Sequence, residues 1–234
     1  MSAAAAITPL PSAPQAVLFD MDGLMLDSER VITDCHARAA AACGHDLPDD
    51  YWLQMVGTGD AVCHALLVER LGEAAADQVL ERSDAFYMER VDAGIPHRPG
   101  IIALLEWLRE RGVPRAVATS TRNPLASHKL RRAGLTGYFE VVCTASDVAQ
   151  PKPAPDVYLL AARRLGVEPA RCLVLEDSPT GVRAALAAGM TPIQIPDLVA
   201  PDAATRALGH RIADSLEVVL PLLQAAFDPV PAAG

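Results

Sequence analysis

The sequence predicts an α/β fold in which a parallel sheet, with helices on both faces, carries a separate all-helical insertion. Three observations support this prediction. Residues 16–19 form an apolar run without charge, which is typical of a buried strand. Residues 30–94 then show helical patterns and no convincing strand. From residue 95 onward, short apolar runs alternate with helical stretches of roughly ten residues, as expected for βα units around a parallel sheet.

The expected elements follow one another in this order. Within the insertion we expect helices over 29–43, 49–56, 60–71 and 74–93. After it, strands are expected over 116–119, 141–143, 172–175 and 191–195. Helices are expected over 101–111, 124–133, 155–165, 179–188 and 215–226. Pro179 begins one of these helices and Gly189 follows it, which are the usual places of proline and glycine. The alternation predicts a Rossmann-like core.

The two ends of the chain differ from the rest. Residues 1–15 are rich in Ala, Pro and Ser and lack the basic start of a secretion signal, so we expect a flexible tail. Residues 228–234 are expected to form a second flexible tail. No apolar stretch reaches about 18 residues, so we expect no membrane partner.

Charge and cysteine content narrow the classes of function. The 234-residue chain has a net charge of −9 at pH 7 and no basic stripe, which argues against a nucleic-acid polymer as partner. Its five cysteines are an odd number without a C-x-x-C spacing, which fits neither a disulfide framework nor a zinc motif. We therefore expect a reducing compartment, the cytoplasm. We also expect a monomer.

The first predicted strand ends in two carboxylates, Asp20 and Asp22. Alternate residues of an extended chain point to one side, so these two should project together. In open α/β sheets the ligand crevice lies beyond the carboxyl ends of the strands. Paired carboxylates there raise each other's pKa unless a cation neutralises them, and oxygen ligands of this kind suit Mg²⁺. A strand followed by a solvated acidic turn would carry the same residues.

The strand expected over 116–119 ends in a polar loop. Thr119, Ser120 and Asn123 lie in this loop, just before a predicted helix. A hydroxyl and free backbone amides at the start of a helix make a site for an anion such as phosphate. The alternative is an ordinary helix cap, which Ser and Thr supply routinely.

The next two strand ends carry a lysine and a second acidic pair. Lys152 lies in a proline-rich loop and is one of only two lysines, the other being Lys129. A stiff loop with a lone lysine favours a fixed cation aimed at an anion, although a solvated lysine is the commoner case. Glu176 and Asp177 follow the strand over 172–175, where they could hold a metal or cap a helix.

These groups occur in a recognisable order, each at the end of its own strand. The chain resembles the haloacid dehalogenase superfamily, in the phosphatase branch that carries a helical cap after the first motif. The resemblance rests on Phe19-Asp20-Met21-Asp22-Gly23, Thr119, Lys152-Pro153-x-Pro155-Asp156 and Glu176-Asp177-Ser178-x-x-Gly181. It implies a core domain over 16–29 and 95–227 and a cap domain over 30–94.

The resemblance also implies a reaction. In that family the first aspartate, here Asp20, attacks a phosphate monoester and forms an aspartyl-phosphate. The second, here Asp22, protonates the leaving oxygen and then activates water. Mg²⁺ would be held by Asp20, Asp22 and Asp177, with Glu176 as a further ligand or a supporting neighbour. The phosphate would contact Thr119, Ser120, Asn123 and Lys152.

Several related activities are alternatives. Haloacid dehalogenases lack the second aspartate, so Asp22 favours phosphoryl transfer. Phosphonoacetaldehyde hydrolases need a cap lysine, and no lysine precedes Lys129. A phosphomutase similar to β-phosphoglucomutase would place an arginine where Asp60 stands, and an acid there would repel a second phosphate. A catalytically inactive binding protein on the same fold is a further alternative, although every expected catalytic position is filled.

The expected function is therefore hydrolysis of a small phosphorylated metabolite, a sugar phosphate or a nucleoside monophosphate. The stretch over 21–29 most resembles 2-deoxyglucose-6-phosphatase and pseudouridine-5′-phosphatase. Side chains of the cap would choose the substrate, and the candidates are Arg30, His36, His64, Arg82 and Tyr87.

Overall fold

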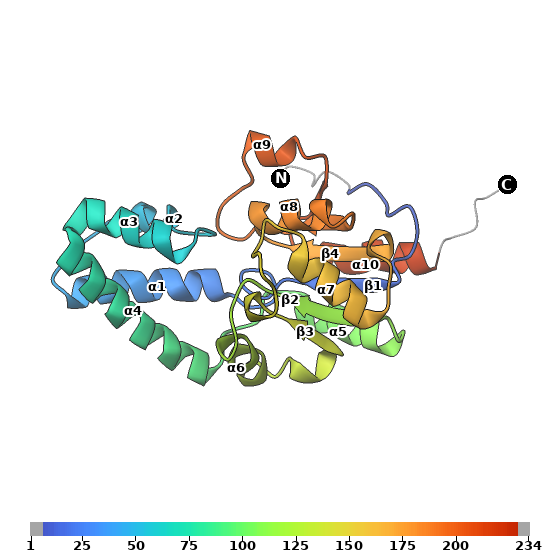
Figure 1. Cartoon of the computed structure of the whole chain (residues 1–234), viewed down its shortest axis with the longest axis horizontal. Helices are drawn as coiled ribbons and strands as arrows, with labels where there is room; N and C mark the ends of the chain where they lie inside the picture. Colours follow the sequence, from blue (N-terminus) through green and yellow to red (C-terminus); the bar gives the residue numbers. More distant parts are fainter. Residues whose placement is uncertain (1–6, 229–234) are drawn as a thin grey trace.

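The computed structural model describes residues 7–228 and shows a sheet domain beside a helical block (Figure 1). Residues 1–6 and 229–234, which the sequence assigns to the two flexible tails, lie outside the described residues. Among the described helices, none is long and apolar enough to cross a membrane.

The core is a six-stranded, wholly parallel sheet with the order β3-β2-β1-β4-β5-β6. The strands are β1 (Ala16–Phe19), β2 (Arg115–Ala118), β3 (Val141–Cys143), β4 (Cys172–Glu176), β5 (Thr191–Gln194) and β6 (Arg211–Ile212). The chain builds the sheet outward in one direction from β1 to β3 and in the other from β4 to β6. A ligand crevice in such sheets lies where the strand order reverses, here beyond the carboxyl ends of β1 and β4.

Helices cover both faces of the sheet, which confirms the expected fold class (Figure 1). Val17 and Phe19 of β1 face one apolar cluster, while Ala16 and Leu18 face the other, as the alternation of a strand requires. The first cluster includes side chains of α5 (Ile101–Glu110), α6 (Leu125–Arg132) and α10 (Leu216–Phe227). The second includes those of α7 (Asp156–Leu165) and α8 (Pro179–Ala187).

The insertion between β1 and α5 is entirely helical. It consists of α1 (Ser28–Ala42), α2 (Asp49–Leu53), α3 (Asp60–Leu71) and α4 (Glu73–Ala93). None of its described residues lies in a strand. Trp52, Leu67 and Val79 are buried in an apolar cluster formed by residues of this block. The block therefore has its own small core.

Two adjacent linkers join the helical block to the sheet domain. The Arg98 amide on the returning linker donates to the carbonyl of Met25 on the outgoing one, at 2.9 Å. Asp197 lies in the loop after β5, and its buried carboxylate accepts from Arg30 and Arg98 at 2.6 and 2.5 Å. The root of the block is thus tied to the carboxyl end of the sheet.

Three features differ from the sequence-based expectation. The sequence does not predict strand β6 or helix α9 (Ala203–Arg206), because elements of two and four residues are too short to show a period. The sequence also predicts a flexible tail over 1–15. Instead, Arg211 of β6 donates to the carbonyls of Thr8 and Pro9 at 2.8 and 2.7 Å, so this part of the segment contacts the core.

The glycines that flank α5 provide a test of the packing of α5 on α10. Gly100 has φ +87° and an added Cβ would lie 2.7 Å from the backbone nitrogen of Glu217. Gly112 has φ +64° and open space around the same position. We expect Gly112→Ala to lower the free energy of unfolding by about 1–2 kcal/mol through its backbone conformation alone. Gly100→Ala should cost a further 1–3 kcal/mol or so, because α10 must move.

Urea denaturation of both variants measures the difference. Equal losses of stability for Gly100→Ala and Gly112→Ala would mean that α10 does not pack against this turn as described.

Candidate active site

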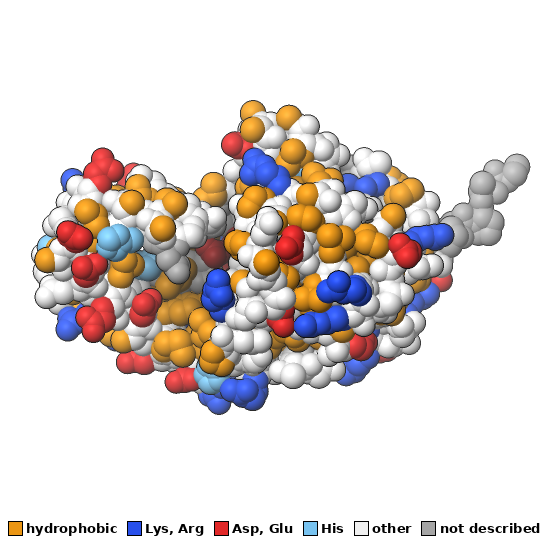
Figure 2. Space-filling view, viewed as in Figure 1, with side chains coloured by type: hydrophobic (Ala, Val, Ile, Leu, Met, Phe, Trp, Pro, Cys, Tyr) orange, Lys and Arg blue, Asp and Glu red, His pale blue; other side chains and the backbone are white. Residues whose placement is uncertain are grey.

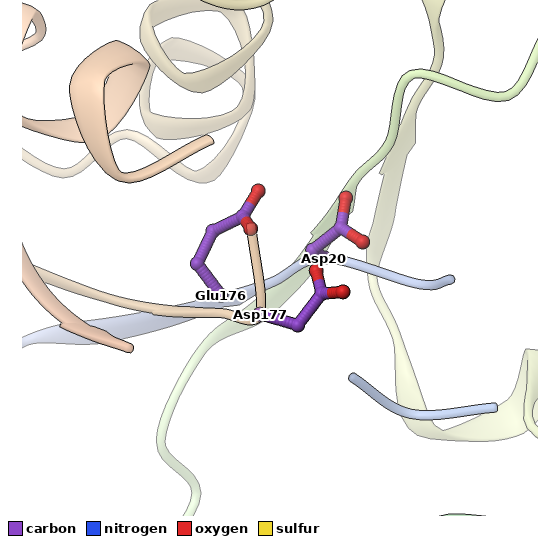
Figure 3. A group of neighbouring side chains, drawn as sticks. All are labelled: Asp20, Glu176 and Asp177. Atoms are coloured by element: carbon purple, nitrogen blue, oxygen red, sulfur yellow. The ribbon is translucent and has the colours of Figure 1, made fainter. Parts of the chain in front are cut away.

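Three carboxylates meet where the strand order reverses. Asp20 directly follows β1, Glu176 ends β4, and Asp177 comes next. The two strands are neighbours, with Phe19 opposite Leu175, so these ends lie side by side. One oxygen of each carboxylate lies within 4.8 Å of the others. Figure 3 shows the three side chains gathered at this edge of the sheet.

Lys152 joins this group from the loop between β3 and α7. Its Nζ donates to Asp20 Oδ1 at 2.6 Å and to Glu176 Oε1 at 2.7 Å. The side chain of Lys152 is only 3% exposed. Burial opposes its charge, but the two carboxylates outweigh burial and hold the pKa of Lys152 well above its usual value. The proline-rich loop therefore delivers a permanent cation to the centre of the cluster.

Glu176 is fully occupied by donors of the protein. Its Oε1 accepts from Lys152 and from the Tyr158 hydroxyl at 2.9 Å, and its Oε2 accepts from the amide and hydroxyl of Ser178 at 2.8 and 3.0 Å. Burial raises the pKa of Glu176, but Lys152 and these donors outweigh burial and lower it. Gly181 leaves the space for this carboxylate, since a Cβ there would lie 1.6 Å from Oε1. Glu176 is thus an ionised support for Lys152.

Asp20 and Asp177 are less well compensated. Burial raises the pKa of Asp20 to about 7, because Lys152 offsets only part of it and Glu176 adds repulsion. The pKa of Asp177 is raised well above its usual value by burial and then by the Glu176 and Asp20 charges. No donor among the described residues contacts the Asp177 carboxylate. The acidic excess and the oxygen donors fit a hard divalent cation.

Asp22 lies at the same end of the sheet but has different partners. Its Oδ2 accepts from the Thr121 hydroxyl at 2.6 Å, and its Oδ1 accepts from the ammonium of Lys129. Lys129 also donates to the hydroxyl of Tyr87 at 2.7 Å, which reaches over from α4 of the helical block. Burial raises the pKa of Asp22, but Lys129 and Thr121 outweigh burial and lower it. The two aspartates thus have separate lysines.

Thr121 and Lys129 are not among the site residues predicted from the sequence, and Tyr87 is predicted only as a candidate for substrate selection by the cap. For Lys129 a signal was available. Lys129 and Leu130 follow Ala126 by three and four residues on α6, the spacing that marks a buried stripe. A lysine in such a stripe needs a partner, and this is one of only two lysines in the chain.

The expected phosphate-binding residues lie beside this centre in the loop after β2. Thr119 is buried, and its Oγ1 accepts from the Thr121 amide at 3.0 Å. Ser120 is exposed at the loop surface. The Oδ1 of Asn123 accepts from the amide and hydroxyl of Ser127 at 3.3 and 2.7 Å, so its side-chain oxygen binds the first turn of α6.

A hollow in the molecular surface separates the helical block from the sheet domain (Figure 2). Among the candidate residues of the block, Tyr87 contacts the site through Lys129. The other candidates have contacts elsewhere: Arg30 with Asp197, His36 with Ser83, His64 with Asp77, and Arg82 with the Ala42 carbonyl. The side-chain oxygen of Glu29 accepts from the Gly57 amide at 3.2 Å, which ties the loop before α3 to the start of α1.

Known proteins are similar to this chain over most of its length. Residues 14–189 match the haloacid dehalogenase-like hydrolases. The chain is 33% identical over 184 residues to the phosphorylated carbohydrates phosphatase of Thermotoga maritima, covering 76% of this chain and 83% of that one. It is 36% identical over 179 residues to hexitol phosphatase A of Escherichia coli, covering 76% and 81%.

A solved structure agrees with these relatives. The HAD family hydrolase from Deinococcus radiodurans, with bound phosphate and sodium, has a TM-score of 0.77 and 32% identity, covering 92% of this chain and 97% of that one. The resemblance expected from the motifs is confirmed, and the protein is a hydrolase enzyme. The chain belongs to the haloacid dehalogenase-like hydrolase family.

Proposed function

We propose that this protein is a magnesium-dependent phosphatase that hydrolyses a small phosphate monoester through an aspartyl-phosphate on Asp20. The observation that carries the proposal is the buried Lys152 ammonium between Asp20 and Glu176, beside the uncompensated Asp177. A fixed cation next to a carboxylate at the end of β1 can receive the negative oxygens of a phosphoryl group.

Two displacements at phosphorus make up the reaction. In the first, an oxygen of Asp20 bonds to phosphorus, the ester bond breaks, and Asp22 gives its proton to the departing oxygen. In the second, a water oxygen bonds to phosphorus, the bond to Asp20 breaks, and Asp22 takes a proton from the water. Inorganic phosphate and free carboxylates result. Uncatalysed monoester hydrolysis is so slow that the site must lower the barrier by well over about 20 kcal/mol.

The phosphoryl oxygens would be held by groups from two loops. In this proposal Lys152, the Thr119 hydroxyl and the Ser120 backbone amide donate hydrogen bonds to the phosphoryl oxygens. Asn123 would contribute through its side-chain nitrogen, because its oxygen is bound by Ser127.

Mg²⁺ would be held by the carboxylates of Asp20 and Asp177 and by the backbone carbonyl of Asp22. Bound there, the ion would neutralise charge that develops on the phosphoryl oxygens. Glu176 supports the site in a different way, since its oxygens already accept from Lys152, Tyr158 and Ser178.

The named relatives support a proposal for the substrate class. Two relatives named above are phosphatases of phosphorylated carbohydrates and hexitols. We propose a sugar phosphate as substrate, with nucleoside monophosphates second, and a cap over 30–94 that selects it above a core over 16–29 and 95–227. We also propose a cytoplasmic location, which is supported by the absence of a disulfide among the described residues. A monomeric state is a further part of the proposal.

A phosphomutase is the main competing function. A mutase must keep water from its aspartyl-phosphate until a second hydroxyl arrives, and it must bind a second phosphate. Asp60 stands where a phosphate-binding arginine is expected for that activity. A catalytically inactive binding protein is a weaker alternative, because every position expected to be catalytic carries the expected residue.

The first test separates a phosphatase from a mutase. β-Glucose 1-phosphate is followed with Mg²⁺, with and without added glucose 1,6-bisphosphate. We expect any consumption to release one inorganic phosphate per substrate and to need no bisphosphate, because Asp22 directs water at the intermediate. Fast conversion to glucose 6-phosphate with little free phosphate would establish the mutase instead.

The second test uses the raised pKa values in the acidic cluster. Asp20, with a pKa of about 7 against a usual 3.8, binds a proton in the folded state that the unfolded state has released. Stability of the metal-free protein therefore falls as pH rises from about 4 to 7. Mg²⁺ competes with those protons, so we expect it to raise the melting temperature more at pH 8 than at pH 5.5.

The control for this test is Asp177→Asn, which should lose most of the Mg²⁺-dependent rise at pH 8. A rise of equal size at both pH values, or one that survives in Asp177→Asn, would place the ion outside this cluster.

A further inference from the structure

Lys129 is a buried lysine that the two-step reaction does not use. It lies on the apolar face of α6, and its side chain is only 3% exposed. A buried ammonium is costly unless it is paired and hydrogen-bonded. Its partners are the Asp22 carboxylate and the Tyr87 hydroxyl, and its Nζ lies 5.2 Å from the centre of the Tyr87 ring. Lys129 thus lies between the helical block and Asp22.

The two oxygens of Asp22 have donors of different kinds. Oδ1 accepts from Lys129, whose ammonium has protons to donate and no lone pair. Oδ2 accepts from the hydroxyl of Thr121, which can turn and accept a proton instead. A proton on Oδ2 can therefore keep the Thr121 contact, whereas a proton on Oδ1 would face the Lys129 ammonium. The Ser28 hydroxyl adds a further hydrogen bond to this carboxylate.

From this asymmetry we propose that Lys129 is a positioning residue, which holds Oδ1 of Asp22 and so leaves Oδ2 as the oxygen that exchanges protons. This role rests on the proposed phosphatase function. In the first step the proton passes from Oδ2 to the leaving oxygen, and in the second a water proton passes to Oδ2. Lys129 touches neither the phosphoryl group nor the water, and it acts through the orientation of Asp22.

A purely structural role is the alternative, because Tyr87 belongs to α4 of the helical block. The same two helices are joined by a second pair, His128 and Asp92, with 2.6 Å between Nε2 and Oδ1. No contact links this pair to Asp22 among the described residues. Asp92→Asn therefore weakens the same interface without disturbing the carboxylate, and it is the matched control.

The experiment measures kcat/KM for phenyl phosphate and p-nitrophenyl phosphate, which report the first step with a poor and a good leaving group. Positioned proton transfer contributes about 10²–10⁴-fold, and the poor leaving group depends on it most. We expect Lys129→Met to lower kcat/KM about 10–100-fold for phenyl phosphate and several-fold less for p-nitrophenyl phosphate. Lys129→Arg should recover part of the loss. Asp92→Asn should leave kcat/KM unchanged for both substrates.

Two further variants make every outcome informative. Tyr87→Phe keeps Lys129 but removes its second acceptor, so it should show a smaller loss of the same kind even where Lys129→Met folds poorly. Asp22→Asn sets the full size of the leaving-group effect. Equal losses for both substrates in Lys129→Met and Tyr87→Phe, or a leaving-group effect in Asp92→Asn, would overturn the positioning role.

The same measurements distinguish an error in the proposed phosphatase function from an error in the proposed role of Lys129. If the unsubstituted protein shows no Mg²⁺-dependent turnover of either substrate, both the proposed phosphatase function and the Lys129 role are wrong. An active parent with a strong leaving-group effect in Asp22→Asn, but none in Lys129→Met or Tyr87→Phe, would contradict the Lys129 role alone.

Discussion

The ion pair of Lys152 with Asp20 and Glu176 is the interaction on which the site depends. Taking an ammonium out of water costs several kcal/mol, and two carboxylates at 2.6 and 2.7 Å offset that cost here. Such a pairing needs β1 and β4 to be neighbours and the loop after β3 to return to them. The sheet order provides the first condition, and the prolines of the loop favour the second.

Charge balance explains how the other acids divide their work. One lysine cannot neutralise Asp20, Glu176 and Asp177 together, and burial, added to by this excess of negative charge, raises the pKa of Asp177. A divalent cation is the simplest way to balance it. Asp22 lies outside this group, since Lys129 and Thr121 hold its carboxylate. Two neighbouring aspartates are thereby kept in different surroundings: a cation bound at the cluster would keep Asp20 ionised for attack, and separate donors orient the Asp22 carboxyl group.

Much of this arrangement could be predicted from the sequence, because it depends on periodicity and on residues at strand ends. The βα alternation gave the parallel sheet, and the strand ends brought Lys152 to the acidic residues. Side-chain direction could not be predicted in the same way. The Asp22 carboxylate accepts from Lys129, which lies far away in the sequence. The Asn123 side-chain oxygen accepts from Ser127 in the helix that follows it. A pattern of residue types does not show which of the available donors a side chain will contact. Strand β6 was too short to show a pattern.

Trapping the phosphorylated enzyme tests the central claim most directly. Protein turning over p-nitrophenyl phosphate with Mg²⁺ is quenched in acid and treated with borohydride, which reduces an aspartyl-phosphate to homoserine, and the peptides are read by mass spectrometry. The account predicts homoserine at Asp20, more of it in Asp22→Asn, and none in Asp20→Asn, which should also be inactive. Turnover without modification of Asp20, or near-normal Mg²⁺-dependent activity in Asp20→Asn, would contradict it.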